Sequence, residues 1–197
     1  MAEPQPEPPL RVDWLGAGDL RDGLPGRLGL TFLPGKRGAS MRYPGRVYRR
    51  ELDADLATLR DLGVRRLLLL VEDPELERWG DPEIVERAAS AGVVIHRWPL
   101  PDGTAPRHAG EMDEMIGILT AARAEGDVAV ACMGGVGRTG TVAACALVSA
   151  GWPAPAAISR VREVRHPTAI ETNEQVSFVE AYERHVSRRA GSANVAP

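Results

Sequence analysis

The stretch "CMGGVGRTG" at residues 132–140 constrains the fold more than any other part of the chain, because of what precedes it. The apolar run "DVAVA" at 127–131 is short and uninterrupted, a pattern typical of a strand buried on both faces of a parallel sheet. Open sheets of this kind bind ligands beyond the carboxyl ends of their strands. The sequence therefore predicts a parallel sheet with a functional loop at 132–140.

Strands and helices are predicted to alternate over most of the chain. Strands are expected at 10–15, 27–33, 46–50, 64–71, 93–98 and 127–131, and helices at 53–62, 82–92, 111–124, 138–150, 155–165 and 172–189. Residues 72–80 are interpreted as an acidic loop, and Asp53 as a helix N-cap. The alternation predicts an α/β fold, a single domain with a central, mostly parallel sheet flanked by helices. The domain is assigned to residues 10–189, with disordered tails at 1–9 and 190–197.

Composition excludes several classes of partner. The net charge of -3, and the lack of a basic tract interleaved with aromatic residues, predict no nucleic-acid partner. The longest apolar run, "LLLLV" at 67–71, is too short to cross a bilayer, so no membrane insertion is expected. No segment near the start has the pattern of a secretory leader, and a cytoplasmic location is the expectation. The oligomeric state stays open.

The two cysteines have different predicted roles. A pair of cysteines makes no disulfide framework, and Cys145 lies inside a predicted helix, where a small core residue is expected. Cys132 lies instead at the junction of strand and loop. No cluster of histidines and cysteines has the spacing of metal ligands, so neither a metal nor a cofactor is predicted.

The loop at 132–140 has the residue types of an anion site. Gly134, Gly135 and Gly137 allow the backbone from Met133 through Val136 to curl, so that successive N–H groups point inward. The following helix adds the partial positive charge of its N-terminus, and Arg138 adds a planar pair of donors. The same field lowers the pKa of a cysteine to about 3.5–7.5 in comparable settings. Cys132 is therefore predicted to be a thiolate nucleophile under a bound phosphate, with the Thr139 hydroxyl available to the sulfur.

This arrangement resembles a known family. Cys132, five residues, Arg138 and Thr139 are similar to the phosphate loop of cysteine-based protein phosphatases. The resemblance is to the dual-specificity side of the protein tyrosine phosphatase superfamily, and within it to the cyclin-dependent kinase inhibitor 3-like branch and its bacterial relatives. It extends over roughly residues 10–185 through "RLGLTFLPGKR", "PLPDGTAP" and "TAIETNEQVSFV".

The resemblance implies a metal-independent phosphatase. Cys132 would attack phosphorus while Asp102, in "PLPDGTAP", protonates the departing oxygen. Asp102 would then activate water against the cysteinyl-phosphate, and Gln175 would orient that water. The implied substrate is a phosphorylated protein or peptide carrying phosphotyrosine, with phosphoserine and phosphothreonine as further substrates.

One residue departs from the family pattern. Ala131 stands where the family usually has a histidine that braces the loop, so impaired rather than absent turnover is expected. Three other functions stay open. They are a phosphatase of phosphoinositides or small phosphoesters, a pseudophosphatase that binds phosphoprotein without hydrolysis, and a rhodanese-like sulfurtransferase. Met133, Gly134 and Val136 add no lysine or arginine to the loop, which argues against a polyphosphorylated lipid head group.

Overall fold

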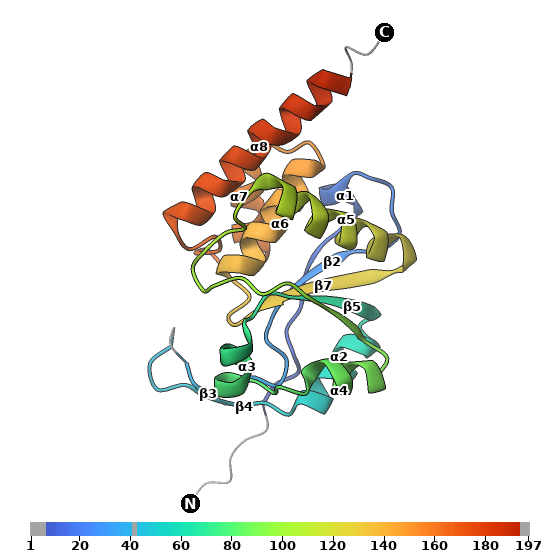
Figure 1. Ribbon diagram of the computed structural model, residues 1–197. Coiled ribbons are helices and arrows are strands. Elements are labelled where there is room, and N and C mark those ends of the chain that lie inside the picture. Colours follow the sequence, from blue (N-terminus) through green and yellow to red (C-terminus); the bar gives the residue numbers. More distant parts are fainter. Residues whose placement is uncertain (1–6, 41–42, 194–197) are drawn as a thin grey trace, which may run out of the picture.

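A computed structural model describes residues 7–40 and 43–193, which form a layered α/β fold (Figure 1). The strands are β1 (Asp13–Leu15), β2 (Leu28–Phe32), β3 (Arg37–Ala39), β4 (Val47–Arg49), β5 (Val64–Leu69), β6 (Val94–Arg97) and β7 (Asp127–Cys132). The helices are α1 (Ala17–Leu20), α2 (Leu52–Asp61), α3 (Asp73–Trp79), α4 (Ile84–Ser90), α5 (Ala109–Glu125), α6 (Gly137–Ser149), α7 (Ala154–Val164) and α8 (Asn173–Ala193).

The central sheet places β7 in the middle. Its strand order is β1-β2-β7-β5-β6, and every neighbouring pair is parallel except β1 and β2. The predicted α/β fold with a mostly parallel sheet is therefore confirmed. Because β2 and β5 flank β7 on both sides, the loop that follows Cys132 opens at the carboxyl edge of the sheet.

Side chains of β7 alternate between two cores, one on each face of the sheet. Val128 and Val130 join the core under α5 and α6, whereas Ala129 and Ala131 join the core that α2 and α4 cover. Figure 1 shows α5, α6, α7 and α8 on one side of the sheet and α2, α3 and α4 on the other. This burial on both faces explains why β7 is apolar from Val128 to Cys132.

Three features differ from the sequence prediction. The acidic segment 72–80 was expected to be a loop, which is wrong, because it contains α3. Pro74 occupies the first turn of this helix, and the Glu75 carboxylate accepts the Glu72 backbone N–H at 2.8 Å in a capping box. The expected strand at 46–50 forms as β4, but it pairs with β3 in a separate two-stranded sheet. Helix α2 starts at Leu52, so Asp53 lies within its first turn and is not the N-cap.

The described residues include parts of both predicted tails, namely residues 7–9 and 190–193. Pro8 and Pro9 line a cavity at the carboxyl edge of the sheet, and α8 continues to Ala193. The remaining residues of both predicted tails lie outside the described ranges, and the domain boundaries stay a prediction. None of the helices in the described ranges is both long and apolar enough to span a bilayer.

Candidate active site

The phosphate loop connects the end of β7 to the start of α6. Its backbone turns at Gly135, which has φ of 66°. A Cβ atom there would lie 2.3 Å from the Thr31 carbonyl oxygen, so only glycine fits this turn. The turn points the Gly135 N–H at the Cys132 sulfur, at 3.2 Å. The loop thus curls around the thiol, as the glycine spacing predicts.

The loop favours the thiolate form of Cys132. Burial raises the pKa of this thiol, but the positive charge of Arg138 and hydrogen bonding from Thr139 outweigh burial, so the pKa lies below its usual value. Thr139 Oγ1 is buried and has no regular hydrogen bond elsewhere in the described chain, which leaves its proton for the sulfur. Cys145 has only burial acting on it, which raises its pKa well above the usual value. The pKa values of the two cysteines are therefore shifted in opposite directions.

Arg138 is held by a residue that the sequence analysis missed. Its Nη1 and Nη2 donate to the two carboxylate oxygens of Glu75, each at 2.7 Å, and Nη1 also donates to the Leu100 carbonyl at 2.8 Å. The guanidinium is buried, which lowers its pKa, but Glu75 outweighs burial and the pKa is raised. The capping box of α3 was a signal that could have located this helix, although nothing in it pairs Glu75 with Arg138.

One donor of Arg138 is left for a ligand. Its Nε is buried and has no hydrogen-bond partner among the described residues. Leaving such a buried N–H donor without a partner costs free energy, unless a bound group accepts a hydrogen bond from it. The carboxylate of Asp102 lies 3.0 Å from Nη2, and its side chain is 74% exposed. The structure thus brings Cys132, Arg138, Thr139 and Asp102 together, with Arg138 between the thiol and the predicted acid.

Gln175 lies beside the phosphate loop, but its amide binds protein groups. Nε2 donates to the Thr104 carbonyl at 3.0 Å, and Oε1 accepts the Glu171 N–H at 2.8 Å. A Cβ atom on Gly137 would lie 3.2 Å from both amide atoms, which shows how closely Gln175 approaches the loop. Its role in placing water stays a prediction.

The segment that carries Asp102 is fixed at several points. The Arg138 bond to Leu100 holds it from one side, and Thr172 Oγ1 donates to the Gly103 carbonyl at 2.9 Å from the other. The Gln175 bond to Thr104 adds a third tie. We call residues 99–106 the acid loop, and these bonds link it to both the phosphate loop and the start of α8.

Two cations hold the outer side of the phosphate loop. Lys36 donates to the Met133 carbonyl at 3.2 Å, and Arg165 Nε donates to the Gly135 carbonyl at 2.8 Å. Arg165 is fixed in turn by Asp13 at 2.7 Å. Ala131, by contrast, is fully buried among apolar side chains. Lys36 is the single lysine of the chain, which could have drawn attention to it, whereas no sequence signal marked Arg165.

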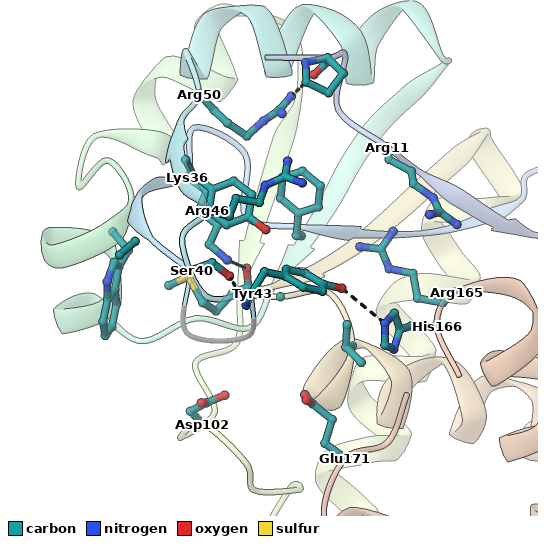
Figure 2. Close-up of a pocket in the computed structure, with 18 of the residues that line it drawn as sticks. Arg11, Lys36, Ser40, Tyr43, Arg46, Arg50, Asp102, Arg165, His166 and Glu171 are labelled. Carbon is teal, nitrogen blue, oxygen red and sulfur yellow. Dashed lines mark hydrogen bonds between the residues drawn. The ribbon is translucent and has the colours of Figure 1, made fainter. Parts of the chain in front are cut away.

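A cavity of about 620 Å³ opens above the phosphate loop (Figure 2). This volume lies within the usual 300–1,000 Å³ of ligand sites and exceeds what one phosphate group needs. Five arginine and lysine side chains line it against two carboxylates: Arg11, Lys36, Arg46, Arg50 and Arg165 against Asp102 and Glu171. The cavity therefore fits an anionic substrate. No group of three metal-ligating side chains occurs in residues 7–40 and 43–193.

Comparison with known sequences identifies the family. The sequence model described as cyclin-dependent kinase inhibitor 3 matches residues 3–153. The chain belongs to this family. Cyclin-dependent kinase inhibitor 3 of Rattus norvegicus is 27% identical over 176 residues, which cover 88% of this chain and 79% of the relative. The Homo sapiens protein of the same name is 26% identical over 176 residues, which again cover 88% of this chain and 79% of the relative.

Solved structures agree with this membership. Kinase associated phosphatase, with serine in place of its catalytic cysteine, has a TM-score of 0.79 at 23% identity, covering 92% of this chain and 98% of that chain. Tk-PTP in the active form has a TM-score of 0.65 at 28% identity, covering 81% and 92%. The homology supports a cysteine-based phosphatase of the dual-specificity type.

Proposed function

We propose that this member of the cyclin-dependent kinase inhibitor 3 family is a metal-independent phosphatase of phosphotyrosine, with phosphoserine and phosphothreonine as further substrates. The observation that carries the proposal is the pair formed by Cys132 and Arg138. A thiol with a lowered pKa lies next to a buried arginine whose Nε lacks a partner within the described chain. A phosphate group over the loop would accept a hydrogen bond from this Nε and present phosphorus to the sulfur.

The first chemical step forms a cysteinyl-phosphate. The Cys132 thiolate attacks phosphorus in line with the leaving oxygen, and the phosphorus–oxygen bond breaks as the sulfur–phosphorus bond forms. Arg138 and the inward N–H groups of the loop stabilise the charge on the phosphoryl oxygens. Asp102 protonates the leaving oxygen, a role supported by the 3.0 Å distance between its carboxylate and Arg138 Nη2.

The second step hydrolyses the intermediate. Asp102, now a carboxylate, takes a proton from water, which attacks phosphorus and releases the Cys132 thiolate. The Thr139 hydroxyl stabilises the sulfur as it leaves, because it has no other regular hydrogen bond in the described chain. Gln175 would direct the water only if its amide exchanged the Thr104 carbonyl for that water.

The test is hydrolysis of an aryl phosphate by matched cysteine variants. Cys132→Ser removes the nucleophile and should lower kcat by roughly 10⁴-fold or more, as nucleophile removal does elsewhere. Cys145→Ser is the control, because Cys145 is a buried core residue of α6. Equal activity of the two variants would refute the mechanism. A folded wild-type protein without turnover would favour a phosphoprotein-binding pseudophosphatase.

A phosphoinositide phosphatase is the second candidate function. The phosphate loop itself adds no cation beyond Arg138, but the cavity wall adds Lys36, Arg46 and Arg11 from other elements. Phosphopeptides, phosphoinositides and nucleotides assayed side by side would separate the candidates. A kcat/KM for phosphoinositides above that for every phosphopeptide would favour the lipid substrate.

A further inference from the structure

One wall of the cavity is formed by β4 and the residues beside it. Side chains of an extended segment alternate between its two faces, so Arg46, Tyr48 and Arg50 share one face. All three line the cavity, whereas Val47 and Arg49 do not (Figure 2). The wall is therefore positively charged, because two of the three side chains that face the cavity are arginines.

Aromatic rings order these cations next to the phosphate loop. The Arg46 guanidinium lies 4.6 Å from the centre of the Tyr48 ring, and the Lys36 ammonium lies 4.4 Å from it. Arg50 lies 5.2 Å from the Phe32 ring. Because Lys36 also binds the Met133 carbonyl, this wall is continuous with the phosphate loop.

The carboxylate of Glu7, near the start of the described chain, contacts the arginines of this wall. Glu7 accepts the Arg49 backbone N–H at 3.1 Å, and its carboxylate lies 3.6 Å from the guanidinium groups of both Arg46 and Arg50. The carbonyl oxygen of the next residue, Pro8, accepts a hydrogen bond from Arg50 Nη2 at 2.9 Å. The arginines of this wall thus bind a carboxylate and the backbone carbonyl of the residue that follows it.

The contacts of Glu7 are looser than those of a permanent ion pair. Arg50 is neutralised by Asp55, whose carboxylate lies 2.6 Å from it and is equally buried. Glu7 lies farther from its arginines, and Arg46 is 47% exposed at the side chain. Charge-assisted bonds are strong at about 2.7–2.9 Å and weaken with distance, so an incoming anion can replace Glu7 at small cost.

We propose that Glu7 marks an anion subsite of the active-site cavity, and that an acidic side chain of a phosphorylated peptide substrate binds there in its place. The subsite consists of the Arg46 and Arg50 guanidinium groups and the Arg49 backbone N–H. The inference rests on the proposed phosphatase function. A peptide fits better than another anion, because the present occupant is the carboxylate of Glu7 and Arg50 also binds the backbone carbonyl of the following residue, Pro8.

The test compares phosphotyrosine peptides that differ in one acidic residue. A glutamate is moved one position at a time along both flanks of the phosphotyrosine, and each peptide has a glutamine counterpart. At the position that reaches the subsite, glutamate should raise kcat/KM roughly two- to fivefold over glutamine, the range of a partly exposed ion pair. High salt should reduce the difference.

Three variants assign the effect to the subsite. Arg46→Ala should abolish the preference for glutamate, and Glu7→Gln should enlarge it by removing the competing carboxylate. Arg37→Ala is the matched control, since Arg37 is an exposed arginine of β3 in the same two-stranded sheet and does not line the cavity. It should retain the preference of the wild-type protein.

The outcomes separate this inference from the proposed function. Absence of aryl phosphate hydrolysis would refute the phosphatase. Fluorescence anisotropy of the labelled peptides with the Cys132→Ser variant would still show whether glutamate binds more tightly than glutamine. No preference at any position, in both the wild-type and Glu7→Gln proteins, would overturn the subsite. So would a preference that survives Arg46→Ala, or inositol phosphates preferred over all peptides.

Discussion

Replacement of Glu75 by glutamine tests whether the buried ion pair on Arg138 supports the catalytic loop. The pair has two bonds of 2.7 Å, and both partners are buried. Removing one partner of a buried pair costs about 3–5 kcal/mol, because the other charge stays buried without compensation. Glutamine keeps one acceptor, and Arg138 keeps its bond to the Leu100 carbonyl, so the cost should be about 2–3 kcal/mol.

The expected effect is visible in both stability and turnover. A chain of this size loses roughly 2–4 °C in Tm for each kcal/mol, so Glu75→Gln should lower Tm by about 4–12 °C. The guanidinium would also lose the contact that fixes its plane, and a displaced catalytic group can lower the rate by as much as about 10²-fold. Differential scanning calorimetry and aryl phosphate hydrolysis measure the two quantities on the same sample.

Glu77→Gln provides the matched control. Glu77 lies on the same helix, α3, and is exposed, so the same change of charge there should alter stability by no more than about 0.5 kcal/mol. If the Glu75→Gln and Glu77→Gln variants had the same Tm and the same rate of aryl phosphate hydrolysis, the ion pair would contribute nothing to holding Arg138. That result would refute the reasoning.

Three further predictions concern the other groups of the site. Alkylation of Cys132 by iodoacetamide should have a pH midpoint below that of a free thiol, and Arg138→Gln should raise the midpoint because it removes the charge that favours the thiolate. A wild-type midpoint at or above the free thiol value would contradict this. Asp102→Asn should slow alkyl phosphates more than nitrophenyl phosphate, since poor leaving groups need the proton; equal losses would point to a structural role. Ala131→His should cost about 1–3 kcal/mol, because the ring enters a filled apolar core, and it should leave the Cys132 pKa no lower. An unchanged Tm together with a more acidic thiol would show that the core has room for a working histidine.

The phosphate loop could be predicted from the sequence because its chemistry is local. Cys132, the glycines, Arg138 and Thr139 lie within a few residues, and the apolar strand before them fixes where the loop opens. Asp102 was identified because its segment resembles the acid-bearing segment of the phosphatase family. In the structure its carboxylate lies 3.0 Å from Arg138 Nη2. The mostly parallel sheet followed from the alternation of strands and helices.

The supporting contacts could not be predicted, since they join distant segments. Glu75 is 63 positions from Arg138, and no pattern near either residue names the other. The proline and acidic residues of 72–80 are common in loops as well as in first turns of helices, which is why α3 was missed. Of the β3–β4 sheet only β4 was predicted, because a strand can be recognised in the sequence while its pairing partner cannot.

The ties on the acid loop have a consequence for how substrate enters. Leu100, Gly103 and Thr104 are all held through their carbonyl oxygens, so Asp102 is in place before any ligand arrives. A site assembled in advance needs no slow closing step, and its association kinetics should stay single-exponential, with a rate proportional to substrate concentration. On the proposed function, the same ties would leave the cavity accessible to a phosphorylated side chain that projects from the surface of a folded protein.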